Sequence, residues 1–171
     1  MAVNRYTRDI PLPGISDGEV GYRGPAVAKI VGVSYRQLDH WTSTGLVTPS
    51  VRDADGSGSQ RLYGFDDIVR LKVIKRLRDA GVSLQRIRKA LDEVAERGLS
   101  LKDLMFASDS AGNVIAVDDQ QQAMDLLMSG QGVFFIAIDP VAAEVTQEVA
   151  AITPERAEPA VITPFDRRRV V

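Results

Sequence analysis

The run from Gly24 to Arg97 constrains the fold more than any other part of the chain, because helix start and stop signals follow one another closely in it. Pro25 suits the first turn of a helix, since its ring presets φ and its missing N–H would be unpaired there. Gly32 then allows a sharp turn. Ser34, with Gln37 three residues later, predicts a capping box. The sequence therefore predicts two short helices joined by a tight turn.

The second of these helices has one apolar face and one face rich in hydrogen-bond donors. It ends at Gly45, since glycine readily adopts the left-handed conformation that follows many helices. Leu38 and Trp41 lie three residues apart and face inward. A helix that reads the major groove needs hydrogen-bonding side chains on its outer face. The outer face carries Tyr35, Arg36, Asp39, His40 and Ser43. The candidates for DNA contact in this helix and at its start are Ser34, Tyr35, Arg36, Gln37, Asp39 and His40.

A β-type segment from Leu46 to Tyr63 follows this helix. Asp55-Gly56, at the centre of Asp53-Ala-Asp-Gly-Ser-Gly58, is a strong signal for a hairpin turn. We interpret the hairpin as the wing of a winged helix-turn-helix. Four of its side chains are expected to hold the DNA backbone, namely Arg52 and Arg61 as cations and Gln60 and Tyr63 as hydrogen-bonding groups.

Two longer helices are predicted after the hairpin. Asp66 and Asp67 favour the positive end of the first one, and Gly81 ends it. Ser83 then caps the second. Apolar residues form one stripe on each helix, with Ile68, Leu71, Ile74 and Leu77 on the first and Leu84, Ile87, Leu91 and Val94 on the second.

Several motifs occur here together at fixed spacing. After the helix-turn-helix come Gly45-Leu-Val-x-Pro49, an Arg-bearing hairpin closing on Arg61-x-Tyr63, and Arg76-Leu-Arg-Asp-Ala-Gly-Val-Ser-Leu-Gln-Arg-Ile-Arg88 before an apolar helix. In this combination residues 22–97 resemble the DNA-binding domain of the MerR family of bacterial transcription regulators. The resemblance implies a homodimer on a near-palindromic site in double-stranded promoter DNA, often distorting that DNA so that RNA polymerase can engage it.

Two features depart from the family pattern. Most members carry an Arg directly after the central Leu of the recognition helix, where this chain has Asp39. A carboxylate there either accepts a hydrogen bond from a base edge such as a cytosine amine, or orders Arg36 or Arg52. We favour the ordering role. The long C-terminal helix through which many members dimerise as a coiled coil is not evident after Arg97.

The rest of the chain divides into three parts. Residues 1–21 have no helical periodicity and are interpreted as a flexible arm, in which Arg5 and Arg8 are candidates for touching DNA. Residues 153–171 contain three prolines and are predicted to be disordered. Between the winged domain, 22–99, and this tail, residues 100–152 predict a small α+β domain, with strands at 104–107, 114–117 and 133–138 and helices at 119–128 and 141–151.

We therefore expect a mainly α protein with small β elements, in which a winged helix-turn-helix precedes an α+β C-terminal domain. So small a domain buries little surface, and we expect it to dimerise or to bind an effector. The alternative to a constitutive regulator is an adaptor whose C-terminal domain binds a small-molecule effector or a protein partner that gates DNA binding. No motif in residues 100–152 identifies the chemistry of an effector.

The distribution of charge supports a nucleic-acid partner. The net charge is −2, but residues 1–102 carry 17 Lys and Arg against 12 Asp and Glu, while residues 103–171 carry 4 against 11. The basic part is the one that contains the recognition helix and the wing. This asymmetry is typical of a DNA-binding domain joined to an acidic one.

The sequence gives little support for other classes of function. The chain has no cysteine and one histidine, which argues against disulfides, zinc fingers, iron–sulfur clusters and any other metal or cofactor site. No nucleophile–base pair or phosphate-binding glycine loop indicates an enzyme. No apolar run approaches the ~20 residues that a membrane span needs, and no signal peptide is visible, so we expect a cytoplasmic protein.

Overall fold

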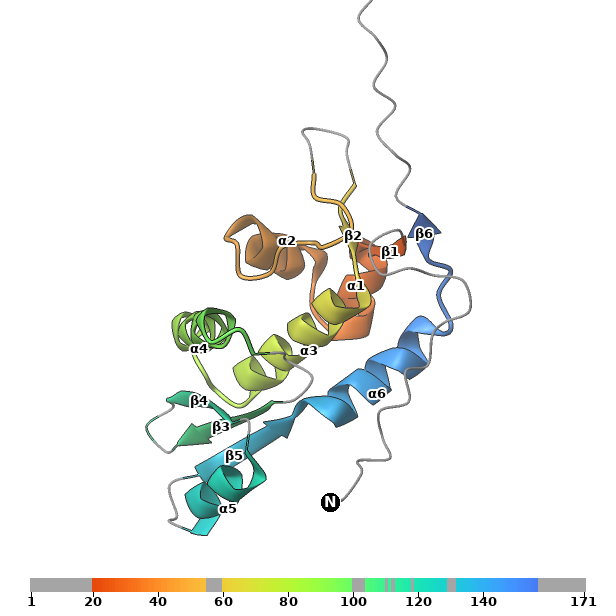
Figure 1. Cartoon of the computed structure of the whole chain (residues 1–171). Helices are drawn as coiled ribbons and strands as arrows, with labels where there is room; N and C mark the ends of the chain where they lie inside the picture. The colour runs from red at the N-terminus through yellow and green to blue at the C-terminus, as the bar shows by residue number, and fades with distance from the viewer. Residues whose placement is uncertain are drawn as a thin grey trace, which may run out of the picture.

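The helix-turn-helix occupies the upper part of the molecule in Figure 1. A computed structural model of the chain describes residues 20–54, 60–99, 104–109, 111, 113–117, 119–128 and 132–156. Helix α1 spans Gly24–Val31 and α2 spans Tyr35–Ser43. The Ser34 hydroxyl accepts a hydrogen bond from the Gln37 amide at 3.1 Å, which is one of the two bonds of the predicted capping box. Gly45 follows with a φ of 69°, so the sequence placed both helices correctly.

A small antiparallel sheet, in the order β2-β1-β6, joins the two ends of the described chain. It consists of β1 (Val20–Arg23), β2 (Leu62–Tyr63) and β6 (Glu155–Arg156). Val20 and Gly21 of β1 fall within the range assigned to the N-terminal arm, and β6 falls within the range assigned to the disordered tail. Both boundaries therefore need correction, because each segment gains its backbone hydrogen bonds only from a strand distant in sequence.

The predicted hairpin contains less regular strand than the sequence suggested. Its return side forms β2, while its outward side contributes a single bridge between Arg52 and Leu62, with backbone N–O distances of 3.1 and 2.8 Å. Leu46 and Val47 belong to the core and not to a strand. The predicted Asp55-Gly56 turn lies outside the described residues.

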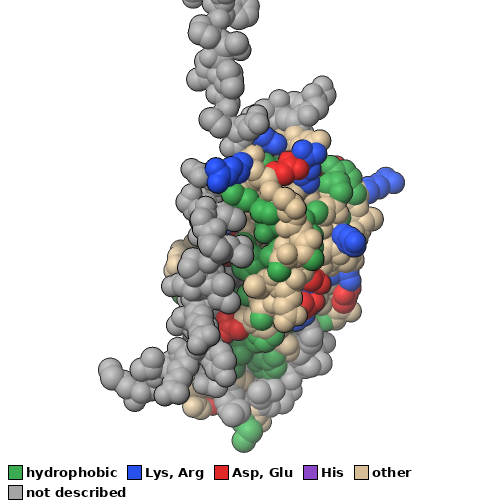
Figure 2. Space-filling model, turned by 90° about the vertical axis from the view of Figure 1, so that its right-hand side faces the viewer, with side chains coloured by type: hydrophobic (Ala, Val, Ile, Leu, Met, Phe, Trp, Pro, Cys, Tyr) green, Lys and Arg blue, Asp and Glu red, His purple; other side chains and the backbone are tan. Residues whose placement is uncertain are grey.

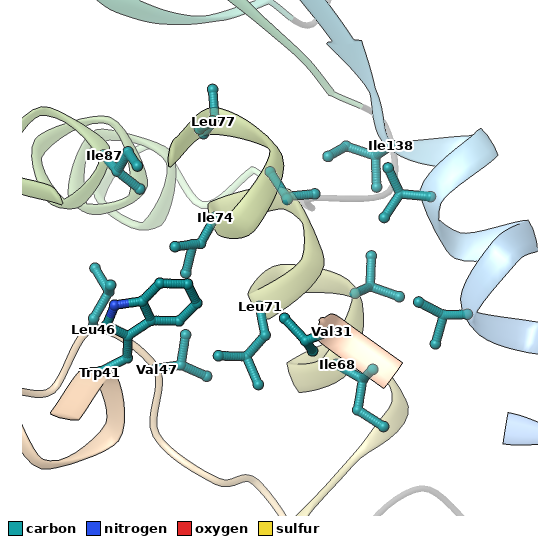
Figure 3. Packing of buried hydrophobic residues seen from close by; sticks show 14 of the residues in the cluster. Val31, Trp41, Leu46, Val47, Ile68, Leu71, Ile74, Leu77, Ile87 and Ile138 are labelled. Atoms are coloured by element: carbon teal, nitrogen blue, oxygen red, sulfur yellow. The ribbon is translucent and has the colours of Figure 1, made fainter. Parts of the chain in front are cut away.

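Helix α3, which spans Phe65–Asp79, lies at the centre of the fold. Its predicted stripe is buried, and Figure 3 shows Leu71 and Ile74 near Trp41 and Val47 while Ile138 approaches from the other side. Helix α4, spanning Leu84–Glu96, is capped by Ser83 as predicted and also contacts α3.

The C-terminal elements form a second sheet, in the order β4-β3-β5, with helices against it. Their bounds are β3 Met105–Asp109, β4 Val114–Val117, α5 Gln120–Met128, β5 Gly132–Ala137 and α6 Ile138–Val149. Side chains alternate between the faces of the sheet, as they must in a strand. Phe106, Ala116 and Ile136 join the main core, while Ala107, Val117 and Phe135 pack with Ala123 of α5.

Helix α6 begins three residues earlier than the sequence predicted. Ile138 was expected in a strand and Val141 at the start of the helix, but Ile138 is the first helical residue. Pro140 is tolerated inside the first turn because the backbone N–H groups there have no partner within the helix. The helix then runs alongside α3 (Figure 1).

One hydrophobic cluster connects the winged region with the C-terminal region. It includes Val27 of α1, Leu71 of α3 and Ile87 of α4 together with Phe106 of β3 and Val145 of α6. The division at residue 100 into two domains remains a prediction, but the elements on its two sides bury their apolar surfaces against each other.

Ion pairs reinforce the contact between α3 and α6. The Lys72 Nζ lies 2.7 Å from Glu144 Oε1 and 2.5 Å from Glu148 Oε2, although the Lys72 side chain is only 8% exposed. Arg76 also pairs with Glu144. A buried ammonium requires such partners, because an unpaired charge in the interior is costly. The hydrogen bond from Lys72 is the main cause that lowers the pKa of Glu144 below its ordinary value.

The lowered pKa of Glu144 predicts a pH-dependent contribution to stability. Because the folded state favours the ionised carboxylate, the contribution is present above the ordinary value of 4.5 and is lost as the pH falls through the lower folded pKa. Replacing Glu144 by Gln should therefore reduce the stability at neutral pH and flatten its loss in acid, as measured by thermal unfolding between pH 3 and 7. Glu93→Gln is the control, because Glu93 is exposed and lies 3.9 Å from Lys89. Equal acid profiles for Glu144→Gln and the unmodified protein would contradict this prediction.

Candidate nucleic-acid interface

The exposed face of α2 carries the predicted recognition residues. Leu38, Trp41 and Thr42 are buried, whereas the outer positions are exposed. The exposed set is Ser34, Tyr35, Arg36, Gln37, Asp39, His40 and Ser43. The sequence thus assigned the two faces correctly, since the helical period alone separates them. Their role in binding DNA stays a prediction.

Tyr35 is the first residue of α2, and it lies next to Gly24, the first residue of α1. Its side chain is 57% exposed, and its ring is seated against Gly24. A Cβ atom built on Gly24 would lie 2.7 Å from Cε2 of this ring. Glycine at the first position of α1 therefore leaves the space in which the ring lies.

An ion-pair network connects α2 to the wing, which we define as the segment from Ser50 to Gly64. Arg61 donates from Nη1 to Asp39 Oδ1 at 2.5 Å and from Nε to Asp53 Oδ1 at 3.2 Å. The hydrogen bond with Asp39 is the main cause that raises the pKa of Arg61. The expectation that Asp39 orders Arg36 or Arg52 is therefore corrected. Asp39 orders Arg61, because the return side of the wing passes next to the outer face of α2.

Arg52 makes contacts within the wing. Its Nε donates to the backbone oxygen of Gln60 at 3.0 Å, and its own backbone pairs with Leu62. The Arg52 guanidinium thus holds the outward side of the wing against the return side, while the Gln60 side chain remains exposed. A guanidinium has five N–H donors, so the bond to Gln60 leaves others for a phosphate.

Tyr63 does not lie at the surface as the sequence analysis expected. Its side chain is 1% exposed, and its hydroxyl lies 2.9 Å from Oγ1 of Thr42. Burial is also the main cause that raises the pKa of the Tyr63 hydroxyl. Tyr63 cannot reach a phosphate from this position. A strand of two residues offers no alternation from which its inward direction could have been predicted.

Asp67 positions the wing, a role that the sequence analysis missed. Its Oδ2 accepts hydrogen bonds from the Ser50 amide at 2.7 Å, the Ser50 hydroxyl at 2.8 Å and the Gly64 amide at 2.8 Å. The buried carboxylate therefore fixes both ends of the wing. The sequence signal was present, because an acid at the third position of a helix often accepts from the residue that caps it, but nothing in the sequence indicated Ser50 as a partner.

A basic side chain of α4 also supports α2. Arg88 donates to the backbone oxygen of Thr44, the residue that follows α2, at 2.9 Å. This contact fixes the end of α2 against α4. Among the described residues, no group of three or more His, Asp or Glu side chains is placed to hold a metal ion.

These structural features agree with the protein family that the sequence matches. Residues 22–94 match the family described as MerR HTH family regulatory protein. The chain contains a MerR-family helix-turn-helix domain. In this MerR domain, α1 and α2 form the helix-turn-helix, and α3 and α4 support it from behind.

Several relatives of this chain are named as regulators. It is 46% identical over 149 residues to an uncharacterized HTH-type transcriptional regulator of Mycobacterium tuberculosis, covering 86% of this chain and 66% of the relative. It is 29% identical over 107 residues to the HTH-type transcriptional regulator HmrR of Sinorhizobium medicae, covering 60% of this chain and 71% of HmrR. The chain thus spans somewhat less than two thirds of the mycobacterial relative's length. None of the described helices has the length and apolar character needed to cross a membrane.

The position of Tyr63 predicts the effect of removing its hydroxyl. Tyr63→Phe should lower the free energy of unfolding by about 1–3 kcal/mol, because it leaves the buried Thr42 hydroxyl without its partner. Thr42→Val tests the same bond, and combining it with Tyr63→Phe should cost less than the sum of the single changes. The salt dependence of DNA binding should stay the same. A shallower salt slope for Tyr63→Phe would show that Tyr63 does touch a phosphate.

Proposed function

We propose that the chain is a sequence-specific, DNA-binding transcription regulator that inserts α2 into the major groove of promoter DNA. The observation that carries the proposal is the exposed, donor-rich face of α2 beside a wing that carries Arg52 and Arg61. Major-groove recognition needs this combination of base-reading side chains and cations for the backbone. The names of the relatives favour the same function.

Each exposed residue has an expected part in such a complex. Arg36 lies in the first turn of α2, the part of a recognition helix that usually meets base edges, and its guanidinium suits a guanine. Tyr35 and His40 supply further contacts on the same face, and Ser34 and Gln37 supply them at its start. Arg52 and Gln60 of the wing are expected to hold phosphates. Figure 2 shows Lys and Arg side chains gathered toward the upper end of the face in view, the end that holds the wing and β6.

We further propose that the protein acts as a homodimer on a near-palindromic site. Two recognition helices related by a two-fold axis read half-sites about one helical turn of DNA apart, roughly 34–36 Å. The dimer contact is assigned to the C-terminal region, in which β4 and β5 are the edge strands of their sheet. RNA polymerase is a further expected partner of a regulator that acts on a promoter.

A second candidate function is favoured by the contact of α6 with α3. A small molecule or a protein partner that binds the C-terminal region and displaces α6 would disturb Lys72, Arg76 and the core around α3. DNA binding would then depend on that partner. The protein would be an adaptor whose C-terminal region gates the winged domain.

Selection of bound fragments from genomic DNA, together with light scattering at two salt concentrations, tests these proposals. A dimer that selects a two-fold-related site and shows a steep salt dependence is the expected result. A monomer that selects no sequence by itself, but does so after addition of cell extract, would favour the gated adaptor. Failure to select any sequence under both conditions would overturn the proposed function.

Substitutions should separate base reading from backbone binding. Arg36→Ala should relax the preference for one base pair in each half-site, a loss of about 1–3 kcal/mol in discrimination. Arg52→Ala should instead weaken binding to selected and random DNA alike and reduce the salt slope by about one. Lys75→Ala is the control, because Lys75 on α3 pairs with Asp79. Competition binding over a range of salt concentrations measures both effects, and an unchanged base preference in Arg36→Ala would rule out its assigned role.

A further inference from the structure

The position of Asp39 on α2 raises a question that the proposed function leaves open. Asp39 lies one helical turn after Arg36 on the same exposed face, and its side chain is 51% exposed. A bare carboxylate on the recognition face would be repelled by the phosphates that line the groove. Such a residue needs both a compensating charge and a favourable contact within the groove.

Arg61 supplies the compensating charge. Its Nη1 lies 2.5 Å from Asp39 Oδ1, and its side chain is only 23% exposed, so the cation is held against the protein. A second contact from Nε to Asp53, at 3.2 Å, fixes the plane of the guanidinium. Arg61 therefore fixes the direction of the Asp39 carboxylate before any DNA is present.

The paired carboxylate retains acceptors for a ligand. An ionised carboxylate can accept about four hydrogen bonds, and of the described side chains only Arg61 is hydrogen-bonded to Asp39. The remaining acceptors lie on the half-exposed side chain, on the face that carries Arg36. The ligand that this arrangement fits is a hydrogen-bond donor at the edge of a base.

The chemistry of the major groove limits which base this is. Guanine presents only acceptors there, and thymine presents an acceptor and a methyl group. Adenine presents its N6 amine next to its own N7 acceptor, which repels a carboxylate, whereas the major-groove edge of cytosine presents the N4 amine and no acceptor of its own. A carboxylate thus favours cytosine.

We propose that Asp39, held in place by Arg61, accepts a hydrogen bond from the N4 amine of a cytosine at one position in each half-site. The assignment rests on the proposed function, since it requires α2 to enter the major groove. Arg61 is then a positioning residue for base reading. Its remaining N–H donors stay available to a phosphate, so one guanidinium links the base contact to the backbone.

Selection from random double-stranded DNA tests the assignment with the chain of residues 1–171 and two substitutions of Asp39. Asp39→Ala should lower the preference for cytosine at one position by about 5- to 10-fold and leave the other positions unchanged. Asp39→Asn keeps an oxygen that accepts from Arg61 and gains an amide NH₂ donor. The donor and the acceptor of this amide match the N7 acceptor and the N6 amine of adenine. The preferred base at that position should therefore change from cytosine to adenine.

Two further variants complete the test. Arg61→Ala should lose the same cytosine preference, because the carboxylate is no longer held, and should also bind random DNA more weakly. Asp139→Asn is the matched control, because it removes an exposed carboxylate from α6, a helix that lies on the other side of α3 from α2 (Figure 1). It should leave every base preference unchanged. Thermal unfolding checks that each variant is folded.

The outcomes separate this assignment from the proposed function. If the unmodified protein selects a site but Asp39→Asn retains its base preference at every position, Asp39 does not read a base and only this assignment is overturned. Asp39→Ala could instead lose affinity for all sequences equally, with a smaller salt slope and unchanged base preferences. That result would also overturn the assignment of Asp39 to cytosine, because Asp39 would then act only by placing Arg61 on a phosphate. Failure of the unmodified protein to select any sequence would overturn the proposed function itself.

Discussion

The burial of α3 on two opposite sides is the constraint on which the rest of the structure depends. Ile68, Leu71 and Ile74 face the helix-turn-helix and α4, while Lys72 and Arg76 face α6. A helix that is covered on only one side needs one apolar stripe, but α3 needs partners around most of its circumference. The helix-turn-helix and the C-terminal region are therefore held to the same helix, and neither buries its apolar surface fully without the other.

The same arrangement changes the meaning of the charge asymmetry along the chain. Glu144 and Glu148 neutralise Lys72 and Arg76 of α3, and Glu155 of β6 pairs with Arg23 of β1. Part of the acidic half thus neutralises part of the basic half within one molecule. The net charges of the two halves therefore overstate the electric field at the surface that would face DNA. What the ion pairs leave exposed on α2 matters more than the totals, because fields at the surface fall off within about 10 Å at moderate salt.

Local signals in the sequence were enough to predict the helix-turn-helix. They did not predict the pairing of segments that are distant in sequence. Ser34 and Gly45 mark the ends of α2 through hydrogen bonds and backbone conformation that involve only their neighbours. Strands β1 and β6 depend on each other from opposite ends of the chain, and neither has a pattern of its own. The second face of α3 was not predicted, because Lys72 and Arg76 pair there with Glu144 and Glu148, which are distant in sequence. At the candidate site, the exposed face of α2 was predicted, but the partner of Asp39 and the burial of Tyr63 were not, because both depend on where the wing returns.

The spacing of the contacts between α2 and the wing explains how an acidic residue is tolerated on the exposed face of α2. Asp39 and Thr42 lie one turn apart on α2, and they are contacted by Arg61 and Tyr63, which lie two residues apart on the return side of the wing. The outer contact is the ion pair of Asp39 with Arg61 at 2.5 Å, and the inner contact is the buried hydrogen bond of Thr42 with Tyr63 at 2.9 Å. Two contacts at different depths resist rotation of the wing about either one alone. The described part of the wing therefore has a fixed place beside α2, and a preorganised surface loses less entropy on association than one that must be ordered by its ligand. Arg61 thus neutralises the Asp39 carboxylate within the protein, and this is how α2 accommodates an acid on its exposed face.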